Sequence, residues 1–512
     1  MALTLSLPVL DSHPAHPPET RPAKVAAWLA SMAVGDPVQA ARAVADAIGA
    51  TNRINVNERR RFELAEKYWA AARQLWPLLE RRFIQVSHPL SGDGLEAARA
   101  LLALAHELSV TYKLLLAREA DRRLVLGGNR HLATLLQRSL QSITRTITSS
   151  YLAYSPVPAN TWLDAHRIYA FAHDRGLHQV GMAEDAGRTP ERAYVKVLLV
   201  ALANPYGFAP GQLATVLRYL DANVQWAKLT DVQPVHRMAK AVAIVPVGHD
   251  FPPFSANKGG AIEGRKMFLL TFELAFQMQE QLRALEAGGE PPPGIGRDVA
   301  SRRSYVALVK RLLRQWAIPP ARQFNRVPSK APVTICTGLP EIWKYVRAIT
   351  ERNGGLESPL PAAARCEVIN HTPAGYALRQ LDTRTTTLRI GELVAIAVEG
   401  RGALQVAIVR WFRNSLHASA LEFGCELLSD APAFAKATAE GSAGGGRVPV
   451  LVLPEQRGRG GDALAQVVVP ADAVRVEQAI TLERDGATSF AVLTKLVEQG
   501  AGFEVYDFVA VG

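Results

Sequence analysis

Apolar residues recur at steps of three and four through most of the first half of the chain. One such series comprises Leu101, Leu104, Leu108, Tyr112 and Leu115. This spacing places the apolar side chains on one face of an α-helix. Several such segments alternate with short polar breaks, which favours an antiparallel array of helices. Residues 23–298 are therefore predicted to form a mainly helical domain, and no fixed-period repeat is apparent in them.

The hydrophobic pattern changes after the proline pair Pro319-Pro320. Short β-type segments replace the helical spacing, and Gly, Asn, Asp and Pro separate them, as is typical of a small closed barrel. A helix over 340–351 is expected to interrupt the strands. The strands themselves are expected at 332–339, 366–370, 376–378, 388–398 and 404–412.

Composition along the chain sets the remaining boundaries. Residues 1–22 are rich in proline and are predicted to be a mobile tail. Residues 299–430 are predicted to hold the barrel together with a leading helix and an arm. A Gly-, Ala- and Ser-rich linker is expected at 431–447. Residues 448–512 are then a C-terminal β region, either a second small barrel or an extension of the first. The predicted fold class is α + β, with several domains.

The chain is basic, with 58 Lys and Arg against 47 Asp and Glu in 512 residues, a formal net charge of +11. A hydrophobic content of 48% with 21% charged residues is typical of a folded protein. The excess of positive charge is expected to attract anions. It does not by itself choose among a nucleotide, a nucleic acid and an acidic membrane surface.

Cysteine usage and hydropathy bear on the compartment. The three cysteines, Cys336, Cys366 and Cys425, lie far apart in the sequence, which argues against a disulfide framework or a zinc cluster. No apolar run approaches the roughly 18 residues that a membrane-spanning helix needs. These features predict a soluble, cytoplasmic protein without a membrane span, cofactor or metal.

Two short polar patterns flank the first predicted barrel strand. The first is an R-x-x-x-R formed by Arg322 and Arg326, and the second is an N-x-T-x-x-G formed by Asn370, Thr372 and Gly375. Arginine suits phosphate bidentately and also reads the O6/N7 edge of guanine. The amide and the hydroxyl supply donors and acceptors for a remaining guanine edge, and the glycine permits a sharp turn. These are the parts of a pocket for a guanine nucleotide with two phosphates.

This arrangement resembles the PilZ family, whose small six-stranded barrels carry R-x-x-x-R on an N-terminal arm and (D/N)-x-S-x-x-G on the barrel. The segments Leu388–Leu393 and Val406–Trp411 also resemble family strands. Thr372 stands where the family usually has serine. The spacing between the two motifs is explained by an insertion at about 340–363.

The resemblance implies a function and roles for the motif residues. It implies a bacterial receptor for the second messenger cyclic di-GMP, with Arg322, Arg326, Asn370, Thr372 and Gly375 at the ligand. Such a receptor would be a switch and not an enzyme, with a protein partner at the helical region. The alternatives are an adaptor whose barrel no longer binds the nucleotide and, less favoured, a nucleic-acid binder that uses the helical surface.

Other patterns predict chemistry only weakly. Gly259–Lys266 is similar to a phosphate-binding loop but has Arg265 where lysine is needed. The histidines at 166, 173 and 178 do not have zinc-clamp spacing and are interpreted as surface residues. The basic run Arg59–Arg61 is interpreted as a solvated helix start. The aromatic residues Tyr68, Trp69, Trp76 and Phe83 are predicted to be core, with a partner groove as the alternative.

Overall fold

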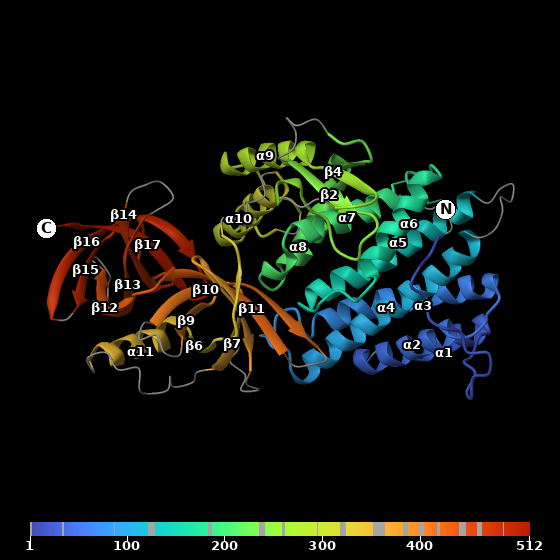
Figure 1. Ribbon diagram of the computed structural model, residues 1–512, viewed down its shortest axis with the longest axis horizontal. Coiled ribbons are helices and arrows are strands. Elements are labelled where there is room, and N and C mark those ends of the chain that lie inside the picture. Colours follow the sequence, from blue (N-terminus) through green and yellow to red (C-terminus); the bar gives the residue numbers. More distant parts are fainter. Residues whose placement is uncertain are drawn as a thin grey trace. The chain divides into compact units, whose positions relative to one another are not determined.

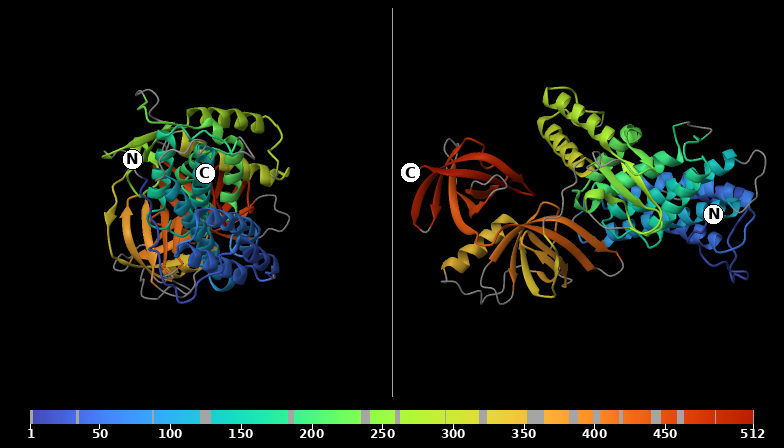
Figure 2. Two further views of the ribbon diagram at one scale, coloured as in Figure 1. Left: turned by 90° about the vertical axis from the view of Figure 1, so that its right-hand side faces the viewer. Right: turned by 45° about the horizontal axis from the view of Figure 1, so that its top comes forward.

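The computed structural model divides the chain into two compact units. Residues 1–86 and 90–322 form the first, here called the helical unit, and residues 87–89 and 323–512 form the second, the β unit. Each unit is described by itself (Figures 1 and 2). The residues that the structure describes are 3–32, 35–86, 88–120, 129–182, 187–234, 241–258, 262–293, 295–317, 324–351, 364–381, 388–398, 404–416, 420–439, 447–457, 463–484 and 486–511.

The helical unit is built around the long helix α4, which packs against α2, α3 and α5 (Figure 1). Its inward faces are the three- and four-step apolar series, so Leu101, Leu104 and Leu108 are fully buried. The helices are α1 (Pro22–Ser31), α2 (Pro37–Asn52), α3 (Glu58–Glu80), α4 (Gly92–Ala120), α5 (Asn129–Leu152), α6 (Thr161–Asp174), α7 (Pro190–Leu202) and α8 (Gln212–Asn223), with 3₁₀ turns at Pro205–Gly207, Val224–Trp226 and Ala256–Lys258.

Helix α4 is long and apolar enough to cross a membrane if judged by length and composition alone. The sequence pattern did not predict such a segment. In the structure 72% of its most apolar stretch is buried among other helices. Its apolar character is therefore that of a core helix in a bundle.

A small antiparallel sheet and two further helices complete the helical unit. The strand order is β1-β4-β2-β3. The Thr271 side chain, just before α9, donates to the backbone oxygen of Trp316 at the end of α10 (2.6 Å). The elements are β1 (Lys228–Thr230), β2 (Val242–Pro246), β3 (Phe254–Ser255), β4 (Lys266–Leu270), α9 (Phe272–Glu286) and α10 (Val299–Trp316).

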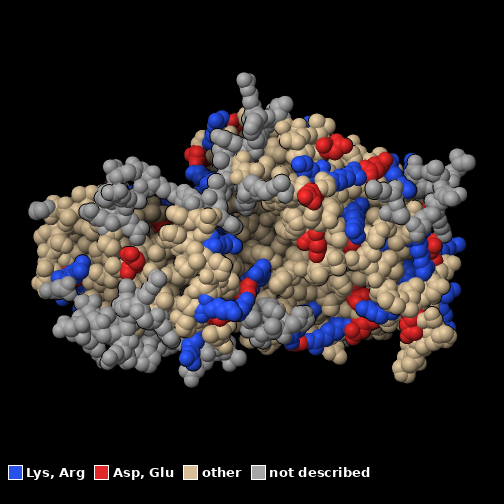
Figure 3. Space-filling view, in the orientation of Figure 1, with Lys and Arg blue, Asp and Glu red and all other residues tan. Residues whose placement is uncertain are grey.

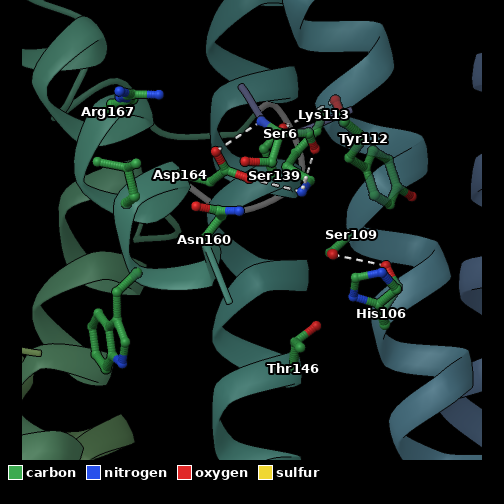
Figure 4. A network of polar contacts seen from close by, with 12 residues as sticks. Ser6, His106, Ser109, Tyr112, Lys113, Ser139, Thr146, Asn160, Asp164 and Arg167 are labelled. Atoms are coloured by element: carbon green, nitrogen blue, oxygen red, sulfur yellow. Dashed lines mark hydrogen bonds and ion pairs between the residues drawn. The ribbon is translucent and has the colours of Figure 1, made fainter. Parts of the chain in front are cut away.

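A buried ion pair joins α4 to α6 and holds part of the N-terminal segment (Figure 4). Lys113 Nζ lies 2.8 Å from Asp164 Oδ2, with both side chains more than nine-tenths buried. Both charges also bind the backbone of Ser6, since Lys113 donates to its carbonyl oxygen (2.9 Å) and its N–H donates to Asp164 (3.0 Å). These bonds satisfy the buried charges, as burial requires. The mobility expected for residues 1–22 stays a prediction, although Ser6 within that segment is held by these two hydrogen bonds.

The β unit opens with a closed barrel of six strands. The ring runs β7-β6-β9-β10-β11-β8 and closes through pairing of β8 with β7, while β5 adds to the outer edge of β7. This confirms the predicted six-stranded, PilZ-like barrel. The strands are β5 (Val327–Pro328), β6 (Pro332–Thr337), β7 (Ala364–Thr372), β8 (Gly375–Gln380), β9 (Leu393–Val398), β10 (Leu404–Ser415) and β11 (Ala420–Ser429).

The C-terminal β region is a second closed barrel of six strands, in the order β12-β13-β14-β17-β16-β15. The predicted helix is also present as α11 (Leu339–Glu351), and it shares one apolar core with both barrels. The strands are β12 (Ala433–Ala439), β13 (Val448–Arg457), β14 (Ala463–Pro470), β15 (Ala479–Arg484), β16 (Ala487–Gln499) and β17 (Phe503–Val511).

The predicted α + β fold class is confirmed, but three details differ from the expected boundaries. Helix α10 belongs to the helical unit and not to the barrel region. Strand β12 lies in the first part of the segment expected to be a linker. Its alternate alanines at 435 and 437 point inward and pack in the core of the second barrel. The three residues 87–89 belong to the β unit, where His88 bridges Leu388.

Candidate functional site

The N-x-T-x-x-G pattern forms the tight hairpin between β7 and β8. Thr372 pairs directly with Gly375, which leaves Pro373 and Ala374 as a two-residue loop. The Thr372 hydroxyl accepts a hydrogen bond from the Ala374 N–H (3.2 Å), a local contact typical of threonine in turns. The hydroxyl proton remains for donation to a ligand.

Gly375 is fixed by its neighbour strand. A Cβ at this position would lie 2.0 Å from the backbone oxygen of Cys425 on β11, and the φ angle is +153°. Any other residue would therefore push β11 away or open the hairpin. The last position of the motif serves the barrel's closure, since Gly375 pairs with Glu426 of β11 as well as with Thr372 of β7.

Cross-strand pairing shows which side of the barrel wall carries the motif. Directly paired residues point to the same face of a sheet. The row Phe412, Phe423 and Leu378 is almost fully buried and marks the inner face. The next row runs from Trp411 through Gly424, Ala377 and Asn370 to Pro328, and it therefore lies on the outer face. Asn370 and Thr372, two residues apart, both belong to that outer face.

Strand β5 brings the arginine arm beside this face. Val327 pairs with His371 and Pro328 with Asn370 in antiparallel register. The same register continued by one residue sets Arg326 opposite Thr372. Arg326 is exposed and makes no ion pair with any described residue, so its guanidinium is available to an anion. Arg322 lies outside the described residues, so its predicted place at the ligand stays a prediction.

Acidic side chains near the hairpin are already paired with arginines. Glu426, the partner of Gly375, accepts from Arg410 Nε (2.7 Å), and Arg410 also holds Glu498 of the second barrel (2.8 Å). Burial opposes ionisation of Glu422, but hydrogen bonds from Arg413 and Arg379 keep its pKa lowered. These carboxylates are therefore neutralised and add little repulsion toward a phosphate.

Charged residues elsewhere do not gather into one continuous patch of a single sign on the face that Figure 3 draws. On the face drawn in Figure 3, Lys and Arg are interspersed with Asp and Glu. Arg61, in the basic run of α3, is fully buried and donates to the backbone oxygens of Thr51 and Ile54. The interpretation of that run as solvated is therefore wrong at Arg61, because the end of α2 offers carbonyl acceptors that the sequence does not reveal.

The other weak patterns resolve as follows. Among the described residues, no group of three or more His, Cys, Asp or Glu could hold a metal. His166 is buried and not a surface residue, with Nδ1 2.5 Å from the Tyr194 hydroxyl and Nε2 2.9 Å from the Phe251 oxygen. The core prediction for the aromatic residues Tyr68, Trp69, Trp76 and Phe83 is confirmed. The start of the Gly259–Lys266 loop lies outside the described residues.

Comparison with known proteins agrees with this geometry. Residues 350–433 match the family model described as the middle PilZ domain of the cyclic-di-GMP receptor FimW. The first barrel of the β unit is a PilZ domain. The matched PilZ segment includes the N-x-T-x-x-G hairpin and begins after the arginine arm. Residues 23–235 match the model described as the N-terminal domain of the same receptor.

One curated relative extends the likeness over both units. The cyclic-di-GMP receptor FimW of Pseudomonas aeruginosa is 21% identical over 485 residues, which covers 81% of this chain and 78% of that protein. The PilZ barrel is thus accompanied by the same kind of helical domain in both proteins.

Two features of the PilZ barrel were missed from the sequence. The sequence indicates Trp411 only as part of a strand, yet it lies in the same outer row as Asn370, and its indole covers Gly424 closely. Strand β11 was not predicted, although Leu421, Phe423 and Cys425 alternate with other residues as a half-buried strand does. That alternation was the available signal.

Proposed function

We propose that this chain is a cytoplasmic bacterial receptor for cyclic di-GMP. The observation that carries the proposal is the β5–β7 register, in which Pro328 pairs with Asn370, so that the chain next to Arg326 runs beside the N-x-T-x-x-G hairpin. Arg326 makes no ion pair with any residue that the structure describes. Arg322 and Arg326 would bind phosphate and guanine, because a guanidinium suits both. Asn370 and Thr372 would read a guanine edge, while Gly375 holds the hairpin.

The proposed action is a switch without catalysis. Along the chain the arm connects α10 of the helical unit to β5 of the β unit, so ligand bound by the arm would also affect the link between the two units. The ligand shifts this equilibrium only by its different affinity for the two arrangements. The helical unit is proposed to carry the signal to a protein partner.

Calorimetric titration with cyclic di-GMP tests the binding site. We expect micromolar or tighter binding by the full chain, and a loss of at least about 10-fold in the Arg326→Ala variant, since a charge-assisted hydrogen bond contributes about 1.5–3 kcal/mol. The Arg322→Ala variant tests the undescribed arm residue in the same way. Arg475→Ala is the matched control, because Arg475 is an exposed arginine on the second barrel.

The outcomes separate the receptor from the adaptor. Binding that Arg326→Ala weakens and Arg475→Ala retains supports the receptor. If the intact chain gives no heat of binding in the titration with cyclic di-GMP, the receptor proposal is wrong and the adaptor with a ligand-free barrel is the better account. Small-angle scattering with and without ligand tests the switch separately, and identical curves for a saturated and a free protein would contradict it.

A further inference from the structure

A pocket of about 340 Å³ lies among α3, α5, α7 and α8, entirely within the helical unit. Its size is at the lower end for small-molecule sites. Four basic residues line it, from α3, α5, α7 and the segment before α7, against one acidic residue, Glu80. The basic residues are Arg73, Arg145, Arg188 and Lys196.

The floor of the pocket is a rigid stack of tryptophan and arginine. Trp69 and Trp76 meet edge to face with ring centres 5.3 Å apart. The Arg145 guanidinium lies 4.5 Å from the Trp76 ring centre and forms an ion pair with Glu80. Because these side chains are mostly buried and pack on one another, the floor is preorganised and does not collapse into the cavity.

Unlike the floor, the rim carries hydrogen-bond donors that can bind a ligand. Arg73, one turn from both tryptophans, is exposed and makes no ion pair with any described residue. Lys196 is held by Asp221 on α8, and its ammonium has three donors, of which one ion pair uses only part. The Gln141 oxygen accepts from Arg138 (3.3 Å), which leaves its NH₂ group as a donor.

We propose that this pocket binds the phosphoryl group of a small molecule. Donors arrive from several helices around one cavity, which suits a tetrahedral group with three terminal oxygens better than a planar carboxylate with two. The guanidinium of Arg73 and the ammonium of Lys196 bind the oxygens, and Gln141 contributes a neutral donor. The site is separate from the barrel, so it does not depend on the proposed cyclic di-GMP function.

Titration of the full chain with inorganic pyrophosphate and, in a second arm, with GMP tests the proposal at about 0.15 M salt. We expect binding of at least one of them, weakened 10-fold or more by Arg73→Ala/Lys196→Ala. Both residues can be replaced without burying a lone charge, because Arg73 is exposed and Asp221 is 66% exposed. Arg60→Ala is the matched control, since Arg60 is an exposed arginine about 20 Å away along the same helix.

The outcomes decide the site and the source of the phosphoryl group. Pyrophosphate and GMP binding with equal affinity indicates recognition of the phosphoryl group alone, while tighter GMP binding indicates a nucleotide. The proposal is overturned if neither binds, if the double variant binds normally, or if Arg326→Ala and not Arg73→Ala/Lys196→Ala removes binding. It is also overturned if a hexaglutamate peptide binds through Arg73 and the phosphates do not. Unchanged thermal unfolding of each variant shows that lost binding is not lost folding.

Discussion

At the scale of single residues, the site depends as much on a missing side chain as on polar groups. In the proposed site Asn370, Thr372 and Arg326 would supply the chemistry, while Gly375 allows β7, β8 and β11 to meet behind them. The sequence identified this glycine from its spacing. The reason that glycine is required is the Cys425 carbonyl oxygen, which occupies the place of a Cβ. That oxygen belongs to a strand 50 residues further along the chain.

Replacement of Gly375 by alanine should destabilise the β unit by about 1–3 kcal/mol, as overpacking does. The methyl group collides with the Cys425 oxygen, so the hairpin shifts and cyclic di-GMP affinity falls with it. Urea unfolding followed by circular dichroism measures the effect. Gly486→Ala is the control, because Gly486 also has a positive φ but has no atom within 4 Å of the added methyl. Equal losses in the two variants would mean that the collision does not matter.

At the scale of elements, the insertion between the two motifs is a structural part of the β unit. Helix α11 buries Leu339, Ile342 and Val346 in a core that also contains strands of both barrels. The Trp343 indole donates to the Ala435 oxygen on β12 (2.8 Å). The sequence predicts this helix, but only as part of an insertion that lengthens the spacing between the R-x-x-x-R and N-x-T-x-x-G motifs. Its amphipathic pattern indicated a buried face but not the partner of that face.

Ile342→Ala should therefore destabilise both barrels together, by about 2–5 kcal/mol, because it opens a cavity in their shared core. Hydrogen exchange read separately on β9–β10 and on β13–β14 should show the two regions losing protection in parallel. Lys344→Ala, at a position 65% exposed on the same helix, should leave both unchanged. Loss of protection in one barrel alone would show that the barrels are stabilised independently.

At the scale of the whole molecule, each unit encloses a histidine that resists protonation. Burial lowers the pKa of His88 in the β unit to about 4 from an ordinary value of 6.5. Burial lowers the pKa of His166 in the helical unit to about 4 as well, against smaller opposing effects of the Phe251 oxygen and Asp250. His166 is satisfied as the neutral form, donating from Nε2 to Phe251 and accepting at Nδ1 from Tyr194.

Both units should therefore lose stability between about pH 6.5 and pH 4. In that window the unfolded chain binds a proton at each histidine and the folded chain does not, so acidification favours unfolding. Each histidine accounts for up to about 3 kcal/mol. Urea unfolding at pH 7.5, 6 and 5 measures the slope for the intact chain and for His166→Gln and His88→Gln. Variants that lose stability as steeply as the intact chain would exclude these histidines as the cause.

The sequence by itself determined the helical first half, the barrel that follows it and the motif that makes the barrel a PilZ domain. These features follow from short-range causes: apolar periodicity, turn residues, and polar groups within a few positions of one another. Only the tertiary structure decided which distant groups meet. It paired Val327 and Pro328, next to Arg326, with His371 and Asn370, and it placed Trp411 in the row of Asn370. It also closed the C-terminal strands into a second barrel and buried Arg61 and His166. Strand register and burial depend on how whole elements pack, and local sequence patterns do not specify that packing.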